Sequence, residues 1–398
     1  MKAYAINLEV RDVYLTAEEE NILQGEHGEG LKMMMEILVK IGEIYEADRL
    51  IPISSAQISG VSYNTIGEHG LHFLKSLQGL KVKVLTTLNP LAFDENHLKE
   101  LKVEDELFEK QMEIIRTYMN MGIRPTATCT PYYFDNIPKL GEHIAWAESS
   151  AVIYANSIIG ARTNREGAVS ALAAAIIGKT PNYGLHLDEE RRATHLIELS
   201  FEPNEEDFPL LGLWVGKNIK GIPYLRLHGS EDDFKLMGAA MAASGSVAMY
   251  HVENFTPEYR EAIGDKIERI VVDRKDIEDY RSEEDVELVA IGCPHASPSE
   301  LRRIVEYLKG KKKRKDKELW IFVARSVKER NENYVRIIED FGGKVMVDTC
   351  VVVSNAGKIF KRIGTTSGKA AFYLSKKKFG GAKVKVTDLY TLLRSVIQ

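Results

Sequence analysis

Val286-Glu287-Leu288-Val289-Ala290-Ile291-Gly292-Cys293-Pro294 opens the stretch that decides the fold, an apolar run ended by glycine and proline. Ser297-Pro298-Ser299-Glu300 then predicts a helix start, with proline at the first helical position and glutamate in the capping-box place. Leu319–Val323 and Lys344–Val347 predict two further strands, separated by a helix over about 326–340. This β-α-β-α-β order predicts a doubly wound parallel sheet over residues 281–398.

The N-terminal residues also alternate between helical and strand patterns. Helices are predicted over 17–46, 65–77 and 104–121, the first opened by a capping box from Thr16 to Glu19. Strands are predicted at 49–54 and 81–87, and residues 54–62 are predicted to form a Ser/Gly loop. We therefore expect an N-terminal α/β region over 1–125, followed by a central helical and mixed region over 126–280. The central region includes a helix from Met237 to Ser244. The predicted fold class is α/β, multi-domain, with mostly parallel sheets and flanking helices.

Length and composition narrow the function classes. A chain of 398 residues suggests two or three domains. Its formal net charge of -5 does not indicate a nucleic-acid-binding protein. The basic run 311–315 is predicted to be a solvated turn. No apolar stretch reaches the roughly 18 residues of a membrane helix, and Met1–Ala5 carries no signal-peptide core. A cytoplasmic protein with no membrane and no nucleic-acid partner is expected.

The three cysteines are the residues with the most chemical information. Cys293 and Cys350 each follow the end of a predicted parallel strand, where open α/β sheets place their ligand sites. Cys129 also follows a β-like run, within the β-rich stretch Arg124–Pro131 that the proline ends. Three converging thiolates suit an iron–sulfur cluster, and without a C-x-x-C pair a zinc ribbon is disfavoured. The alternative is three unrelated cysteines, each a small core residue.

Several loops, taken in order along nearly the whole chain, resemble the aconitase X family. They comprise Ile53–Tyr63, Thr128–Tyr133, Trp146–Val152, Asn156, Gly160–Gly167, Gly292–Ser297 and Gly364–Ala370. The resemblance implies a fold similar to the first three domains of aconitase. It also implies a separate small subunit, in place of a fused fourth domain, that supplies a catalytic serine.

The same resemblance implies a hydro-lyase. Archaeal members of the family dehydrate (R)-5-phosphomevalonate to trans-anhydromevalonate 5-phosphate, in a modified mevalonate route to isoprenoids. The implied cofactor is an iron–sulfur cluster, [4Fe-4S] with one open iron, that acts as a Lewis acid on the substrate hydroxyl. Two alternatives stay open: a dehydratase of another hydroxy acid such as cis-3-hydroxy-L-proline, and a non-catalytic metal-binding scaffold subunit.

Candidate site residues follow from the matched loops. Metal ligands are expected at Cys129, Cys293 and Cys350. Catalytic roles are expected for Glu148, Ser149 and Lys369, and substrate contacts for Gly60, Val61, Ser62, Asn89, Pro90, Glu148, Ser149 and Lys369. Each has a simpler alternative, such as a turn for Gly60 and for Asn89-Pro90, a helix cap for Glu148, or a surface position for Lys369.

Three more residues are weaker candidates. Arg162 and Arg165 are phosphate-binding or helix-end residues, and His295 is expected to hydrogen-bond a cluster sulfur. The run Gly364-Thr365-Thr366-Ser367-Gly368-Lys369 is not a P-loop. Only three residues separate its glycines, and Ala370 follows the lysine.

Overall fold

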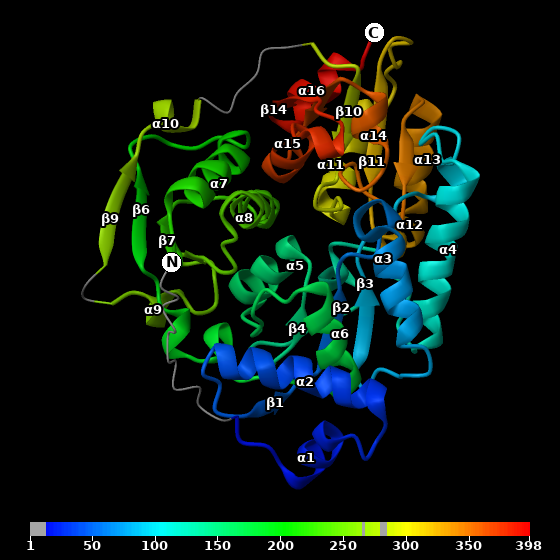
Figure 1. Cartoon of the computed structure of the whole chain (residues 1–398). Helices are drawn as coiled ribbons and strands as arrows, with labels where there is room; N and C mark the ends of the chain where they lie inside the picture. Colours follow the sequence, from blue (N-terminus) through cyan, green and yellow to red (C-terminus); the bar gives the residue numbers. More distant parts are fainter. Residues whose placement is uncertain (1–12, 265–266, 279–284) are drawn as a thin grey trace, which may run out of the picture.

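The computed structural model describes residues 13–264, 267–278 and 285–398. The N-terminal residues 1–5 and the expected domain boundary at 280 lie outside the described residues. Figure 1 shows three groups of strands, each flanked by helices. All the pairings within the three larger sheets are parallel. Among the described residues, the antiparallel pairs are the small ladder of β1 (Leu50–Pro52) with β5 (Lys179–Pro181) and an isolated bridge between Lys313 and Ile397. The predicted α/β class with mostly parallel sheets is confirmed.

The N-terminal sheet has the order β3-β2-β4, with β2 (Ser55–Ile58) between β3 (Leu85–Leu88) and β4 (Ala145–Trp146). Helix α6 (Ala168–Ile177) packs on β2, and α2 (Glu29–Ile44) packs on α6. Residues 55–58, expected to lie in a loop, are therefore the central strand. Their small and polar side chains gave no strand pattern, yet all four are buried.

The helix predicted over 17–46 is two helices, α1 (Ala17–Gln24) and α2. Gly25 ends α1 with φ 90° and Gly28 precedes α2 with φ 95°, both in the left-handed region that glycine adopts without a Cβ clash. The predicted capping box from Thr16 to Glu19 is confirmed. Helices α3 (Tyr63–Ser76) and α4 (Asp105–Asn120) pack together, close to their predicted bounds.

The middle sheet has the order β8-β7-β6-β9. Its strands are β6 (His195–Leu199), β7 (Pro223–Arg226), β8 (His251–Val252) and β9 (Glu268–Val272). Helix α8 (Glu231–Gly245) contains the predicted helix from Met237 to Ser244. It packs against α7 (Asp207–Asn218), against α5 (Ser149–Tyr154) and against α15 (Gly368–Leu374). Helix α8 thus touches elements from all parts of the chain, as Figure 1 shows near its centre.

The C-terminal sheet has the order β12-β11-β10-β13-β14. Its strands are β10 (Leu288–Ile291), β11 (Glu318–Phe322), β12 (Lys344–Met346), β13 (Arg362–Thr365) and β14 (Lys383–Val386). Helix α11 (Pro298–Leu308) begins with the predicted capping box. The helix predicted over 326–340 is divided at Asn331 into α12 (Arg325–Arg330) and α13 (Glu332–Phe341). The strand order reverses between β10 and β13, and such a switch point is where open α/β sheets bind ligands.

Two loops join the first and last sheets. The Leu91 N–H donates to the Asp348 carbonyl at 2.7 Å, and the Thr349 hydroxyl donates to the Leu91 carbonyl at 2.9 Å. The buried Asp94 carboxylate accepts the Val347 N–H at 2.9 Å. The segment after β3 is thereby held to the segment after β12.

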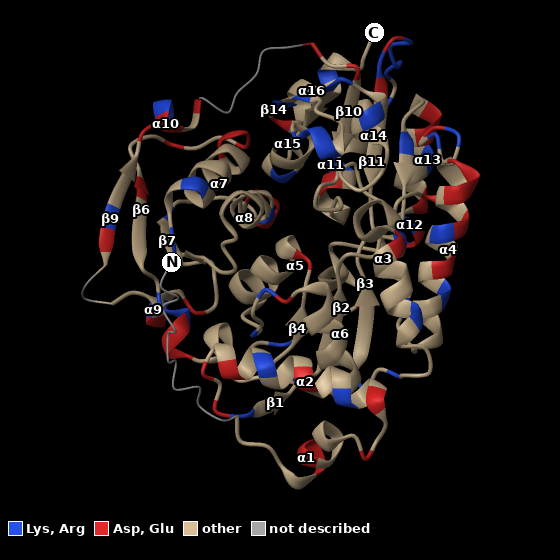
Figure 2. Ribbon diagram, viewed as in Figure 1, with Lys and Arg blue, Asp and Glu red and all other residues tan. Residues whose placement is uncertain are grey.

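The outer surface mixes both signs of charge. Figure 2 shows acidic and basic residues interspersed on α4 and α13. The run 311–315 connects α11 to β11 and is exposed or half-buried, which confirms the predicted solvated turn. Within the described residues, no helix is both long and apolar enough to cross a bilayer.

Candidate active site

A cleft of about 290 Å³ lies where the first and last sheets meet. Its walls come from the segments that follow β2, β3, β4, β10, β12 and β13. All eleven residues expected as metal ligands, catalytic residues or substrate contacts line this cleft: Gly60, Val61, Ser62, Asn89, Pro90, Cys129, Glu148, Ser149, Cys293, Cys350 and Lys369. The loops therefore converge as expected of strand ends on facing sheet edges.

The three cysteines are free and buried, with exposed fractions of 4%, 3% and 7% for Cys129, Cys293 and Cys350. Cys293 follows β10 and Cys350 follows β12, as predicted. Cys129 does not follow a strand. Its segment runs beside β3, with the Arg124 N–H on the Thr86 carbonyl and the Thr128 N–H on the Leu88 carbonyl, and forms only an isolated bridge there.

His295 connects the loops of all three cysteines. Its backbone N–H donates to the Cys129 Sγ at 3.2 Å. Its Nε2 lies 2.8 Å from the Thr349 carbonyl, which only accepts, so Nε2 carries the proton. Nδ1 then accepts from the Thr128 hydroxyl at 2.9 Å. Burial lowers the pKa of His295 to about 4, which keeps this neutral tautomer. The structure shows a backbone hydrogen bond from His295 to the Cys129 sulfur and ring bonds to Thr128 and Thr349, and the expected bond to a cluster sulfur stays a prediction.

Glu148 and Lys369 form a buried ion pair at the cleft wall. The Glu148 carboxylate also accepts from Asn89 Nδ2 at 2.6 Å, from the Ser150 N–H at 3.3 Å and from the Ser149 hydroxyl at 3.4 Å. Burial alone would raise the pKa of Glu148, but the Lys369 charge and these hydrogen bonds lower it to about 2. Burial likewise opposes the charge of Lys369, yet Glu148 raises its pKa. Both groups are ionised at neutral pH.

Unlike Glu148 and Lys369, the three cysteine thiols are held in their neutral form by their surroundings. Burial raises the pKa of Cys129 and Cys350, and raises that of Cys293 to about 12, although the Lys369 charge partly offsets the effect. Without a bound metal the three groups are neutral S–H groups. Binding of a soft metal centre must therefore displace their protons.

The donor set fits a cluster better than a single ion. Among the described residues, no three His, Cys, Asp or Glu side chains surround one point at metal-binding distance. In a cluster, each thiolate binds a different iron, so the sulfurs need not meet at one point. Three soft thiol donors that line one cleft suit that chemistry.

One residue that supports the site, Gln111, was not predicted from the sequence. Gln111 on α4 is fully buried; its Nε2 donates to the Val61 carbonyl at 3.1 Å, and its Oε1 accepts the Tyr63 and Ala92 N–H groups. It therefore fixes both the 60–62 loop and the segment after Asn89. The available signal was a glutamine on the apolar stripe of an amphipathic helix. Arg165, only a weak candidate before, also lines the cleft.

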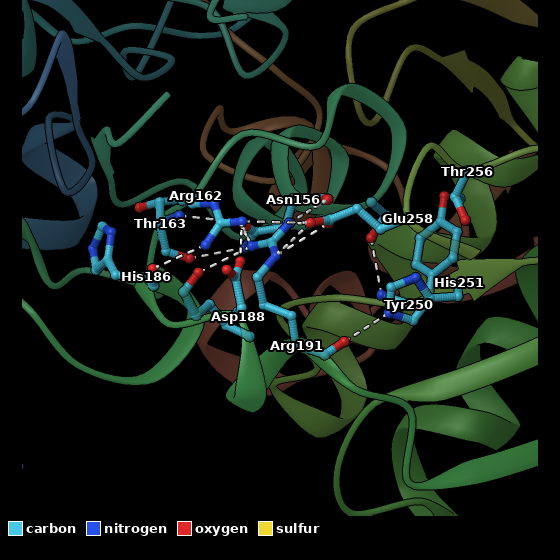
Figure 3. Close-up of polar contacts among 12 residues, drawn as sticks. Asn156, Arg162, Thr163, His186, Asp188, Arg191, Tyr250, His251, Thr256 and Glu258 are labelled. Atoms are coloured by element: carbon cyan, nitrogen blue, oxygen red, sulfur yellow. Dashed lines mark hydrogen bonds and ion pairs between the residues drawn. The ribbon is translucent and has the colours of Figure 1, made fainter. Parts of the chain in front are cut away.

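Arg162 lies elsewhere. Figure 3 shows it in a polar cluster between the first and middle parts of the chain, where it pairs with Asp188 and donates to the His186 carbonyl at 3.1 Å. The same cluster holds the buried Arg191, which binds the Glu258 carboxylate and the Asn156 carbonyl. Arg162 therefore does not line the cleft, and its side chain is paired within this polar cluster.

Parallel strands that end at a shared cleft, lined by three free thiols and a buried ion pair, define a multi-domain α/β protein with a ligand site between its sheets. Family models described as aconitase X first, second and third domains match residues 12–189, 193–282 and 286–398. This chain belongs to the aconitase X family.

Its relatives include two named phosphomevalonate dehydratase large subunit. That of Thermococcus kodakarensis is 49% identical and covers 96% of this chain and 99% of its own length. That of Methanocaldococcus jannaschii is 48% identical over 96% of this chain and all of its own. A cis-3-hydroxy-L-proline dehydratase of Pseudomonas aeruginosa is 35% identical, with 84% of this chain and 61% of its own covered.

A solved structure agrees with these matches. The holo-form of Thermococcus kodakaraensis aconitase X superposes with a TM-score of 0.90 at 48% identity, over 96% of this chain and 100% of that one.

Proposed function

We propose that this chain is the large subunit of a hydro-lyase that dehydrates (R)-5-phosphomevalonate to trans-anhydromevalonate 5-phosphate. The observation that carries the proposal is the meeting of three buried free thiols and the Glu148–Lys369 pair in one cleft. The chain is also nearly half identical, along almost its whole length, to large subunits of that name. Dehydration of another hydroxy acid is less supported, because the hydroxyproline enzymes are more distant.

An iron–sulfur cluster held by Cys129, Cys293 and Cys350 belongs to the proposal, with [4Fe-4S] and one open iron as its composition. When bound, it supplies a Lewis acid that polarises the substrate hydroxyl. The chain's own part is to hold three soft donors at the cleft, with the loops of all three tied together through His295.

In this proposal Glu148 orients the substrate hydroxyl and does not transfer protons. Loss of water requires removal of a C2 proton and departure of the C3 hydroxyl. A carboxylate with a pKa near 2 is a weak base and holds no proton to donate at neutral pH. Its fixed negative charge can instead accept a hydrogen bond from the substrate hydroxyl. Asn89 supports this role, since its amide N–H group binds Glu148 while its Oδ1 is buried and unpartnered among the described residues.

The two anionic groups of the substrate, its carboxylate and its phosphate, both require donors. The 60–62 loop offers backbone N–H groups at the cleft and is held in place by Gln111. Ser149 hydrogen-bonds Glu148. Lys369 places its charge beside Glu148 and Ser150, where it balances the carboxylate. Backbone donors beside the substrate carboxylate stabilise the charge that builds up as the C2 proton leaves.

The proton acceptor is proposed to come from a partner. The name of the relatives implies a small subunit, and we propose that it supplies a catalytic serine over this cleft. The assembled enzyme is proposed to be cytoplasmic.

The test is an anaerobic preparation of the chain with its small subunit. Iron, sulfide and zinc are measured, absorbance and EPR spectra are recorded, and turnover of (R)-5-phosphomevalonate is followed. We expect iron, sulfide and dehydration, and we expect a Cys293→Ala variant to lose the cluster spectrum and turnover. Zinc without iron or sulfide would support a non-catalytic scaffold, and turnover of cis-3-hydroxy-L-proline alone would support the other dehydratase.

A further inference from the structure

The cleft carries little uncompensated positive charge. Of the described residues that line it, only Arg165 and Lys369 have cationic side chains. The Lys369 charge is neutralised by Glu148. Arg165 has no carboxylate within ion-pair distance among residues 13–264, 267–278 and 285–398. Its one hydrogen bond there runs from Nη1 to the Ala242 carbonyl at 2.9 Å. One guanidinium edge is thus anchored to α8, and the charge remains available.

A hydroxyl without a partner lines the same cleft. Ser62 is 1% exposed and precedes α3, yet its Oγ makes no cap bond to the helix and no hydrogen bond to the described residues. A buried hydroxyl left without a partner destabilises the folded chain unless a ligand supplies the missing hydrogen bond. Gly60, two residues before, packs against Ala168, three residues after Arg165. The serine loop and the arginine segment therefore form one wall.

We infer that Arg165 and the Ser62 hydroxyl form a subsite for the phosphate group of the substrate, an inference that rests on the proposed function. The two anionic groups of 5-phosphomevalonate lie at opposite ends of a flexible chain. The carboxylate is next to the reacting carbons and must lie near the buried cysteines and Glu148. Arg165 is exposed, at the border between this cleft and a neighbouring hollow that it also lines.

The chemistry of the two groups suits a phosphate. A guanidinium presents parallel N–H groups that match two phosphate oxygens, and its charge is permanent. A phosphate is doubly charged near neutral pH, so it is bound best where its remaining oxygens stay hydrated, at an exposed residue. The Ser62 O–H donates to a third oxygen.

The test compares the substrate with its dephosphorylated form. The two-subunit enzyme is assayed with 5-phosphomevalonate, and mevalonate is used as a competitive inhibitor. For Arg165→Gln we expect KM to rise on the order of 10- to 100-fold, with kcat within about threefold and the inhibition constant of mevalonate unchanged. Arg165→Lys should recover part of the loss, and Ser62→Ala should show a smaller rise in KM.

A neighbouring arginine provides the matched control for the loss of one positive charge. Arg192 is exposed and lines only the adjoining hollow, so Arg192→Gln removes the same charge and should leave KM unchanged. Equal weakening of mevalonate and of 5-phosphomevalonate by Arg165→Gln would assign the carboxylate to Arg165 and overturn the inference, as would an unchanged KM. A wild-type enzyme that does not turn over 5-phosphomevalonate would refute the proposed function itself. Iron content and melting temperature confirm that each variant is folded.

Discussion

Replacing Lys369 by methionine tests how the cleft holds its charge. The change leaves the Glu148 carboxylate, 8% exposed, without its cation. Glu148 has its pKa lowered from 4.5 to about 2, and at about 1.4 kcal/mol per unit this corresponds to roughly 3 kcal/mol of stabilisation of the ionised form. Breaking a buried pair on one side typically costs about 3–5 kcal/mol. We therefore expect the free energy of unfolding of Lys369→Met to fall by about 3–5 kcal/mol at pH 8.

The loss of unfolding free energy in Lys369→Met should also depend on pH, and its direction follows from the pKa of Glu148. In the wild type, the Glu148 pKa is below its unfolded value, so its contribution is complete above about pH 4.5 and is lost only toward pH 2. In Lys369→Met, burial dominates and the folded pKa is above 4.5. The variant then loses stability as pH rises through that value, and its deficit should be smaller at pH 5 than at pH 8.

The assay is denaturant unfolding of the anaerobic, metal-free chain at pH 5 and pH 8. Glu148→Gln in the Lys369→Met background should recover more than half of the loss, because a neutral amide needs no counter-charge. Lys40→Met is the matched control, since that lysine is 72% exposed in its pair with Glu43 and should cost less than about 0.5 kcal/mol. A Lys369→Met deficit below about 1 kcal/mol, or one that is equal at both pH values, would refute the reasoning.

Three further predictions concern other residues. Gly292 has φ 103°, and a Cβ there would lie 2.1 Å from the Phe322 carbonyl oxygen. We expect Gly292→Ala to lower the melting temperature and the iron content together. His295→Ala removes both ring bonds that tie the cysteine loops and should speed iron loss to a chelator by about 10- to 100-fold; an unchanged rate would contradict its positioning role. Burial lowers the pKa of His186 to about 3, so protonation favours the unfolded chain. Unfolding free energy should therefore decline as pH falls below 6.5, by about 1.4 kcal/mol per unit from this residue, and unfolding titrations should show a shallower decline for His186→Gln.

The sequence predicted the strand ends well and the irregular segments poorly. The short runs before Cys293 and Cys350 are mostly apolar and alternate with predicted helices, so both strands and the position of both thiols at the sheet edge could be predicted. Strand β2 could not, because Ser55 and Gln57 are polar residues buried at the centre of a sheet. The division of the first helix depends on two glycines that helical periodicity alone does not detect.

Long-range contacts explain why some features of the site could not be predicted from the sequence. The ring of His295 reaches Thr128 and Thr349, residues distant in sequence, so no local pattern reveals its connections. The partner of Lys369 could not be foreseen for the same reason. The roles of the site residues and the domain boundaries at 125 and 280 stay predictions.

The separation of Cys129 from the other two thiols along the chain has a consequence for maturation. A nascent or partly folded chain presents at most two of the three sulfurs in one place, because the third arrives only when the segment beside β3 docks against the Cys293 and Cys350 loops. The proposed iron–sulfur cluster would then assemble only on chains that have completed folding. Under the proposed function, unfolded copies would compete poorly for iron.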